Sequence, residues 1–517
     1  MGRYKSYLLV PLLLFLWFFP GIRATEISGA GSATGEAILK HARYLASDEL
    51  MGRGIDTPGL AKAKDYITEE FRRYGLAPGG AGGAYVQGLE VVSGVKARDP
   101  SAFAFGDGPN LRLNEDWIPL GLSSSRAVAG EVVFVGYGIT AKDYGYDDYA
   151  SVDVQGKIAL VLRYEPPPRD EKSPFRKPPR FSSHSTLRAK AANARNHGAA
   201  AMVLVDLQPE RARDKELISI ARSMGRGEGE LLAAQVQGSA TEKYLEERGV
   251  SLSRLKEQID REEKPASMPL PGLKISVAVS IEKITQTVHN VIGILPGSDP
   301  RLRDEVIVVG AHYDHLGLGA YGTRDSSAEG QIHNGADDNA SGTSVLLALA
   351  SSLSRLPEKP PRTIVFAAFA GEELGLYGSR YLVAHPPVPL ASIKAMVNLD
   401  MVGRMKDNAV SVSGTGSAKE FQNLVDEAGR PLGIAIRGSS RNSGGSDHTP
   451  FYQKGIPVLH FHTGLHEDYH RPTDDWEKLN IEGMAKIGDL VLAVLKNLAS
   501  AQEPPTFVPP ASNSSGR

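Results

Sequence analysis

Four apolar runs in the second half of the chain each lead into a histidine or an acidic residue. The runs and the residues that follow them are 306–309 with His312, 363–370 with Glu372 and Glu373, 393–399 with Asp400, and 456–461 with His470. Short apolar runs bounded by glycine and followed by helix-like segments are typical of buried parallel strands. Because ligands of open α/β sheets bind at the carboxyl ends of such strands, the pattern predicts a metal site at one sheet edge.

Composition limits what such a site can be. The chain has 517 residues, which is too long for one ordinary domain, so we expect at least two. Its net charge of −2 gives no reason to expect nucleic acid or an acidic membrane surface as a partner. There is no cysteine, so disulfides and thiolate ligands are excluded, and any metal must be held by histidine and carboxylate.

The N-terminus has the pattern of a signal peptide. Arg3 and Lys5 precede an apolar run over residues 7–22, and the small residue Ala24 follows it. The run is short for a membrane span and is interrupted by two prolines. We therefore expect residues 1–24 to be removed from a secreted or periplasmic protein with no stable membrane span, with an uncleaved N-terminal anchor as the alternative.

The rest of the chain divides by composition. Residues 33–74 read as helical, with Thr57 and Pro58 as the start of a second part and Gly75 as its C-cap. From about residue 127, short strands with polar loops predict a β-rich insert. The sequence of the main sheet resumes near residue 290. The expected units are a signal peptide (1–24), an N-terminal part of the catalytic domain (25–126), the insert (127–285), the catalytic core (286–500) and a disordered tail (501–517).

Several of the polar residues have a simpler explanation when taken alone. A lone His312-x-Asp314 is typical of a hydrogen-bonded surface pair. Acidic residues ahead of an apolar helix are commonly N-caps, which explains one aspartate in the stretch 335–342 but not two. Asp400 lies in apolar surroundings, where a carboxylate must be paired, hydrogen-bonded or metal-bound. The strand-end pattern as a whole therefore favours a metal site.

Residues 466–470 read His-Glu-Asp-Tyr-His and match the His-Glu-x-x-His pattern of zinc proteases. That mechanism requires a helix, so that both histidines share one face. Gly464 and Pro472 flank the segment and leave little room for a helix. We therefore expect a loop in which only some of the histidines bind metal.

The order of these motifs resembles peptidase family M28, a family of co-catalytic zinc peptidases that includes bacterial secreted aminopeptidases. The resemblance covers residues 290–498 and rests on five motifs in the right order, carrying His312, Asp338, Glu373, Asp400 and Tyr469-His470. Residues 45–53 resemble the N-terminal part of bacterial members. Residues 132–207 resemble a protease-associated (PA) domain. The resemblance implies a mixed, largely parallel α/β sheet flanked by helices, with an inserted β-rich PA-like domain.

The resemblance also implies a role for each residue. Asp338 would bridge two Zn²⁺ ions, one held also by His312 and Asp400, the other by Glu373 and His470. The two ions would share a water and lower its pKa. In addition, Glu372 would act as the base toward that water, Asp314 would orient His312, and Tyr469 would donate to the oxyanion or merely pack in its loop.

The remaining polar residues carry no ligand role in this interpretation. Ser446-Asp447-His448 is expected to be structural or to face the substrate. Five histidines are expected to be outer partners of the site or surface groups: His315, His333, His460, His462 and His466.

The leading functional hypothesis is a secreted di-zinc aminopeptidase acting on peptides or proteins. A carboxypeptidase or dipeptidase would use the same motifs, because terminal specificity depends on pocket residues. A glutaminyl cyclase would use a related fold with one zinc and no hydrolysis. A non-catalytic binding protein on the same scaffold is a fourth reading, disfavoured because all five ligands are present. Zinc is the expected metal, although His and carboxylate ligands also accept Co²⁺ or Mn²⁺.

Overall fold

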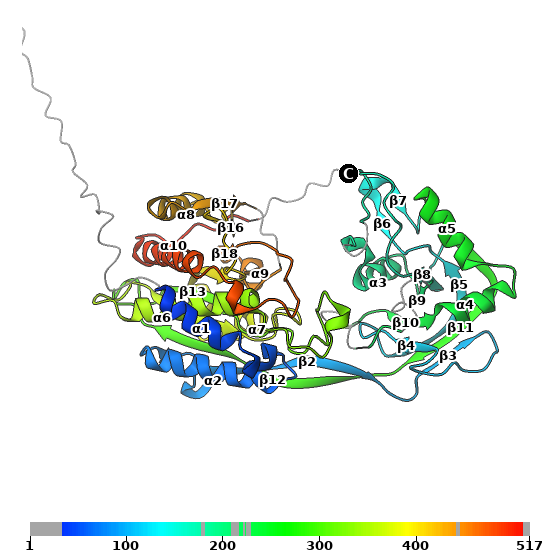
Figure 1. The fold of residues 1–517 in the computed structure, drawn as a ribbon, viewed down its shortest axis with the longest axis horizontal. Helices are drawn as coiled ribbons and strands as arrows, with labels where there is room; N and C mark the ends of the chain where they lie inside the picture. Colours follow the sequence, from blue (N-terminus) through cyan, green and yellow to red (C-terminus); the bar gives the residue numbers. More distant parts are fainter. Residues whose placement is uncertain are drawn as a thin grey trace, which may run out of the picture.

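The structure is a computed structural model that describes residues 34–176, 181–207, 217–220, 223, 229–440 and 445–509. The expected signal peptide lies outside these residues. The described chain forms two sheets, each packed against its own helices and joined to the other by a two-stranded ribbon (Figure 1). None of the helices in these ranges is both long and apolar enough to cross a membrane.

The first sheet contains the region expected to be catalytic, is called the catalytic sheet for that reason, and mixes parallel and antiparallel pairs. Its strand order is β1-β12-β14-β13-β15-β18-β16-β17, with β2 paired to β12. The elements are α1 (Gly35–Leu45), α2 (Pro58–Arg73), β1 (Ala77–Pro78), β2 (Val86–Ala97), β12 (Ile281–Leu295), β13 (Val306–His312), α6 (Gly342–Ser354), β14 (Thr363–Phe369), α7 (Tyr377–Ala384), β15 (Ile393–Leu399), β16 (Ala409–Ser413), α8 (Phe421–Gly429), β17 (Ala435–Ser439), α9 (His448–Gln453), β18 (Val458–His462) and α10 (Ile481–Ser500). The central strands β14, β13, β15 and β18 are parallel to one another, which confirms the predicted α/β class.

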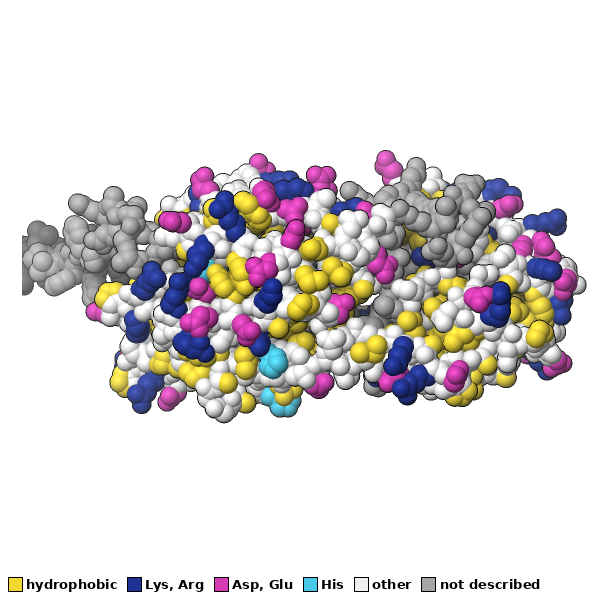
Figure 2. Space-filling model, turned by 60° about the horizontal axis from the view of Figure 1, so that its bottom comes forward, with side chains coloured by type: hydrophobic (Ala, Val, Ile, Leu, Met, Phe, Trp, Pro, Cys, Tyr) yellow, Lys and Arg dark blue, Asp and Glu magenta, His cyan; other side chains and the backbone are white. Residues whose placement is uncertain are grey.

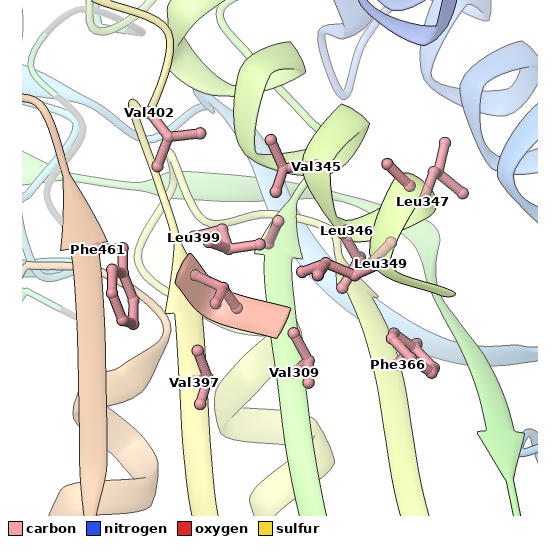
Figure 3. Packing of buried hydrophobic residues seen from close by; sticks show 14 of the residues in the cluster. Val309, Val345, Leu346, Leu347, Leu349, Phe366, Val397, Leu399, Val402 and Phe461 are labelled. Carbon is pink, nitrogen blue, oxygen red and sulfur yellow. The ribbon is translucent and has the colours of Figure 1, made fainter. Parts of the chain in front are cut away.

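Both faces of this sheet are covered, which explains why its central strands are apolar throughout. On one face, Val309 and Val397 of the strands pack against Leu346 and Leu349 of α6 (Figure 3). On the other face, Phe451 of α9 joins a second cluster with residues of the same strands. Full burial of such a side chain is worth roughly 1.5–3 kcal/mol, so the two clusters fix the strand ends rigidly in space.

The second sheet forms the insert. Its order is β3-β11-β5-β8-β9-β10-β4, and β6 and β7 form a separate pair. The elements are β3 (Ala102–Phe105), β4 (Trp117–Pro119), β5 (Arg126–Phe134), β6 (Thr140–Ala141), β7 (Tyr146–Asp147), β8 (Ile158–Leu162), α3 (Leu187–Asn196), β9 (Ala201–Asp206), β10 (Leu232–Gln237), α4 (Gly238–Glu246), α5 (Leu252–Glu262) and β11 (Met268–Val279).

The limits of the second sheet differ from the expected insert of 127–285. Strands β3 and β4 precede residue 127 and pair with β11 and β10, whereas β12 already belongs to the catalytic sheet. The chain crosses between the two regions near Arg98 and Ser280, where the Arg98 N–H donates to the Ser280 carbonyl at 2.8 Å. Composition did not reveal this boundary because β3 and β4 are short and lie between polar loops.

The C-terminal tail differs from expectation, whereas the N-terminal helical stretch has the two parts that were expected. A turn separates α1 from α2, Thr57 is the N-cap of α2, and Pro58 is its first residue. Residues 501–509 pack on the catalytic sheet: Val508 N–H donates to the Ser417 carbonyl at 2.8 Å. The Phe507 ring lies 5.6 Å from that of Tyr452. This part of the expected disordered tail is therefore docked, and residues 510–517 lie outside the description.

The surface agrees with the near-neutral charge. On the face shown in Figure 2, basic and acidic side chains are intermixed over both regions. This face therefore offers no extended area of one sign to a polyanion such as nucleic acid.

Candidate metal centre

The carboxyl ends of the four central strands meet at one edge of the catalytic sheet. His312 is the last residue of β13, and Asp400 directly follows β15. Glu372 and Glu373 follow β14 after a turn at Gly371, whose φ of 77° favours glycine. His470 lies on the loop after β18, the next strand beyond β15. The strand pattern of the sequence thus corresponds to a single place in the fold.

Asp338 lies between two histidines and directs one carboxylate oxygen to each. Its Oδ1 is 3.3 Å from His312 Nε2, and its Oδ2 is 3.2 Å from His470 Nε2. Asp400 Oδ1 is also 3.3 Å from His312 Nε2, and Glu373 Oε2 is 3.3 Å from His470 Nε2. The five side chains form two groups of three donor atoms that share Asp338.

The hydrogen bonds of the two histidines show that these groups suit a cation. His470 Nδ1 lies 2.8 Å from the Gly322 carbonyl and must donate to it, so in the neutral ring Nε2 carries a lone pair. That nitrogen is buried and makes no hydrogen bond, although two carboxylates lie beside it. His312 Nδ1 likewise faces the Asp314 carbonyl at 3.2 Å. Lone pairs aimed at carboxylates repel unless a proton or cation lies between them, and imidazole with carboxylate is a donor set for Zn²⁺.

The pKa shifts of the two histidines report the same electrostatics. Burial lowers the pKa of His312, but Asp400 and Asp338 outweigh burial and raise it well above the usual value. Burial also lowers the pKa of His470, but Glu373 and Asp338 outweigh burial and raise this pKa well above the usual value. The cluster thus favours a positive charge at both imidazoles, which is the condition that a bound dication satisfies.

Glu372 lies beside these donors and is 5% exposed. Burial raises the pKa of its carboxyl well above the usual value, and the charges of Glu373, Asp447 and Asp400 act in the same direction, against His312. A raised pKa makes a carboxylate a stronger proton acceptor, which suits a general base.

Asp314 holds the turn that carries both glutamates. Its Oδ1 accepts the Glu372 N–H at 3.2 Å and its Oδ2 accepts the Glu373 N–H at 3.4 Å. The resemblance implied that its carboxylate orients His312, but the histidine donates to the main-chain oxygen, and the carboxylate oxygen is 3.8 Å from Nδ1. Asp314 therefore positions His312 and the glutamates through different atoms.

Tyr469 lies next to His470 with its ring stacked on the imidazole, the centroids 3.9 Å apart. The Arg324 guanidinium lies 4.5 Å from the centroid of the Tyr469 ring. Burial and the carboxylates of Asp338 and Glu373 raise the pKa of the phenol, so it remains a hydrogen-bond donor at neutral pH.

Two residues that were expected only as structural or outer groups hold the carboxylate ligands. Ser446 Oγ donates to Asp400 Oδ2 at 2.7 Å, and His315 Nδ1 lies 2.8 Å from Glu373 Oε1. Each terminal carboxylate thus has one oxygen held while the other faces a histidine. His315 also lies close enough to Asp338 and Glu373 to form a possible ligand group. Nothing in the spacing of these residues indicates which carboxylate they reach.

The His-Glu-Asp-Tyr-His segment is a loop, as expected. His466 Nε2 is 3.1 Å from Asp337 Oδ2, one residue before the shared aspartate. Asp468 pairs with Arg404 at 3.2 Å. The two histidines of the pattern therefore serve different carboxylates and share no helix face.

Four other histidines belong to neither donor group, although burial lowers the pKa of His460 and His462 and the charge of Asp400 opposes that lowering. His448, His460 and His462 form a column of stacked rings with centroids 4.4 and 5.1 Å apart. His333 Nε2 lies 2.8 Å from Thr323 Oγ1.

With this geometry in hand, comparison with known proteins identifies the family. The sequence pattern described as peptidase family M28 matches residues 290–495, which contain all five donors. The chain belongs to peptidase family M28. The PA domain pattern matches residues 128–242 of this M28 peptidase, within the second sheet. The chain is thus a zinc metallopeptidase, a hydrolase, that carries a PA domain.

The relatives of the M28 peptidase include aminopeptidases. Aminopeptidase YwaD of Bacillus subtilis (strain 168) is 28% identical over 397 residues, covering 74% of this chain and 72% of the relative. Leupeptin-inactivating enzyme 1 of Streptomyces exfoliatus is 32% identical over 174 residues, or 33% of this chain and 35% of the relative.

Solved structures share the whole fold of this M28 peptidase. An aminopeptidase from Aneurinibacillus sp. strain AM-1 superposes with a TM-score of 0.58 at 23% identity, covering 94% of this chain and 98% of that one. A zinc aminopeptidase from Bacillus subtilis gives 0.53 at 20% identity, covering 89% and 94%. At these identities the likeness concerns the fold.

Proposed function

We propose that this M28 peptidase is an exported aminopeptidase that uses two zinc ions held by His312, Asp338, Glu373, Asp400 and His470. The observation that carries the proposal is the position of Asp338, whose two oxygens each face a different histidine. A single-ion site would need one such group, whereas here two complete groups share a carboxylate. Three protein donors for each ion leave room for water and substrate, as in catalytic zinc sites.

Bound zinc supplies Lewis acidity toward water and toward the scissile carbonyl. Glu372 supplies the proton transfer: its carboxylate accepts a proton from the attacking water and then gives it to the leaving amine. Its buried position beside the donors suits this role, because burial raises the pKa of the carboxyl and so makes the carboxylate a stronger proton acceptor.

The neighbouring side chains hold this arrangement in place. Asp314 fixes the main chain of Glu372 and Glu373 through two N–H bonds. We assign the oxyanion donor to the Tyr469 phenol; its ring stacks on His470, which supports a position beside the ligands.

Amino-terminal specificity and export rest on different support. The first is suggested by relatives named as aminopeptidases, including the one from Bacillus subtilis. Export is suggested by the signal-peptide pattern of residues 1–24.

The test compares wild type with Glu372→Gln for zinc content and for hydrolysis of matched peptides with free and acetylated N-termini. We expect two zinc ions per chain in both proteins, and a fall in kcat of roughly 10²–10⁴-fold in the variant, the usual contribution of a general base. Only free N-termini should be cleaved by wild type. Cleavage of acetylated peptides would favour a carboxypeptidase, and one zinc with cyclisation of N-terminal glutamine would favour a cyclase.

A further inference from the structure

The turn Asp48–Arg53 lies against the metal centre, although no step of the proposed reaction uses it. It joins α1 to α2 and reaches the loops that carry His312 and Asp338. The His315 N–H donates to the Arg53 carbonyl at 3.2 Å, and the Gly317 N–H donates to the Gly52 carbonyl at 3.1 Å. The turn is therefore hydrogen-bonded into the loop that follows β13.

The Arg53 side chain continues into the interior and is 0% exposed. Its Nε donates to the Tyr313 carbonyl at 2.8 Å, its Nη1 to the Asn334 carbonyl at 2.7 Å, and its Nη2 to the Gly335 carbonyl at 2.9 Å. A further bond from Nη1 reaches the Leu45 carbonyl at the end of α1. One guanidinium thus binds three separate segments of main chain.

Two of these segments carry ligands of the metal centre. Tyr313 is the residue after His312, and Gly335 lies three residues before the shared Asp338. The planar fork of arginine joins the two loops, a geometry that lysine does not reproduce.

The charge of Arg53 also matters at this place. Among the described residues it has no carboxylate within ion-pair distance, and its hydrogen bonds go to neutral carbonyls. A buried cation of this kind is costly unless nearby charges compensate it. Asp314, Asp338, Asp474 and Glu373 provide that compensation from beyond hydrogen-bond distance.

The turn has little freedom to shift. Gly52 has φ of 65°, and a Cβ atom there would lie 2.3 Å from the His333 carbonyl oxygen and 2.7 Å from that of Gly317. The turn is therefore tightly packed against the segments that Arg53 joins.

We propose that Arg53 is a positioning residue of the metal centre, which holds the His312 and Asp338 loops at the spacing that zinc requires and offsets their negative charge. The inference rests on the proposed two-zinc function. It assigns a role to the N-terminal turn: the strand ends and loops of the catalytic sheet supply the ligands, and the turn sets the spacing of His312 and Asp338.

The experiment measures zinc affinity of metal-free Arg53→Met and Arg53→Lys by competition with a chromophoric chelator, and their unfolding by calorimetry. Both variants should bind zinc at least 10-fold more weakly than wild type while remaining folded. In Arg53→Ala, millimolar guanidinium ion should restore part of the affinity. The control is Arg362→Met, because Arg362 is also buried and donates to the Leu498 carbonyl, away from the donors; unlike Arg53 it also pairs with Glu305 at 2.7 Å. This control should lose stability and keep wild-type zinc affinity.

The outcomes separate the two proposals. Folded Arg53 variants that bind zinc as tightly as wild type would overturn the role of Arg53, and so would an equal loss of affinity in Arg362→Met. If Arg53→Met fails to fold, the zinc affinity of Arg53→Lys and the rescue of Arg53→Ala by guanidinium ion test the role of Arg53 instead. Wild type that binds fewer than two zinc ions would instead overturn the proposed function.

Discussion

The two sheets of this protein have the same kind of buried parallel strands, but they differ in how the charged side chains at the strand ends are paired. Both have parallel central strands that are buried along their length. In the insert, the charged residues at the ends of β8 and β9 pair with each other, as Arg163 contacts Asp206 at 2.8 Å. In the catalytic sheet, the strand ends bring carboxylates together around two histidines. Among the described residues, the groups of histidine and carboxylate side chains that could hold a metal ion lie at these strand ends of the catalytic sheet.

The contrast between the two sheets shows how a functional site differs from a sheet that is merely stable. Buried charges that are matched one to one need nothing more, whereas an excess of buried carboxylates is tolerable only with an added cation. Both regions have charged side chains at their strand ends. The regions differ in whether those strand-end charges are balanced within the protein.

The largest expected effect comes from removing the shared carboxylate. Asp338→Asn should reduce zinc content below one ion per chain and lower kcat/KM by more than the roughly 10- to 100-fold that loss of an outer partner costs. Metal analysis and peptide hydrolysis measure both. The matched control, Asp206→Asn in the insert, should leave zinc content unchanged and destabilise the insert by about 1–3 kcal/mol, as expected for an unsatisfied partner. Equal zinc loss in the two variants would erase the contrast between the sheets.

Removing zinc should affect the two regions unequally. If free zinc is about 100-fold above its dissociation constant, each occupied site stabilises the catalytic region by roughly 2.7 kcal/mol, and chelation removes this. Calorimetry with and without chelator should show the catalytic transition shifted to lower temperature and the insert transition unchanged. A uniform shift of both transitions would argue that the regions unfold together.

The smallest effect concerns a buried histidine outside the metal centre. His41 lies between the hydroxyl groups of Tyr66 and Tyr74, at 2.7 and 3.1 Å, and burial lowers its pKa to about 4. The unfolded chain therefore takes up the proton first as pH falls below 6.5. Stability should be complete above that value and decrease toward pH 4 by up to about 3 kcal/mol.

Denaturant unfolding of the zinc-free protein measures this slope, since metal loss at low pH would otherwise contribute. His41→Gln, which does not titrate, should remove that part of the pH dependence. An unchanged slope in the variant would assign the effect to other groups. His41 can then be compared with His312, which is equally buried but whose pKa is raised by the carboxylates around it.

The sequence predicted what depends on local pattern. The apolar runs predicted β13, β14, β15 and β18, and the polar residues at their ends do converge. Residues that act through distant partners were not predicted. Ser446 reaches Asp400 across 46 residues, and Arg53 reaches Gly335 across 282. Such contacts follow from the packing of whole elements, which a single sequence does not reveal.

The boundary of the insert was also not predicted from the sequence, because it depends on pairing between distant strands. Composition changed near residue 127, where β5 begins, but the chain had already entered the second sheet at β3. Strand pairing between β3 and β11 joins residues far apart in the sequence, such as Ala102 and Ala278, and this pairing defines the unit, not composition.

The ribbon of β2 and β12 has a consequence for how such proteins diversify. Both crossings of the chain lie in this one antiparallel pair, which runs from Val86 opposite Val291 to Ala97 opposite Ile281. Adding two residues to each strand would move the insert by about 7 Å and preserve which side chains face each way, whereas adding one would reverse them. The ribbon is therefore a position at which an insert can be exchanged or displaced while the metal ligands keep their places.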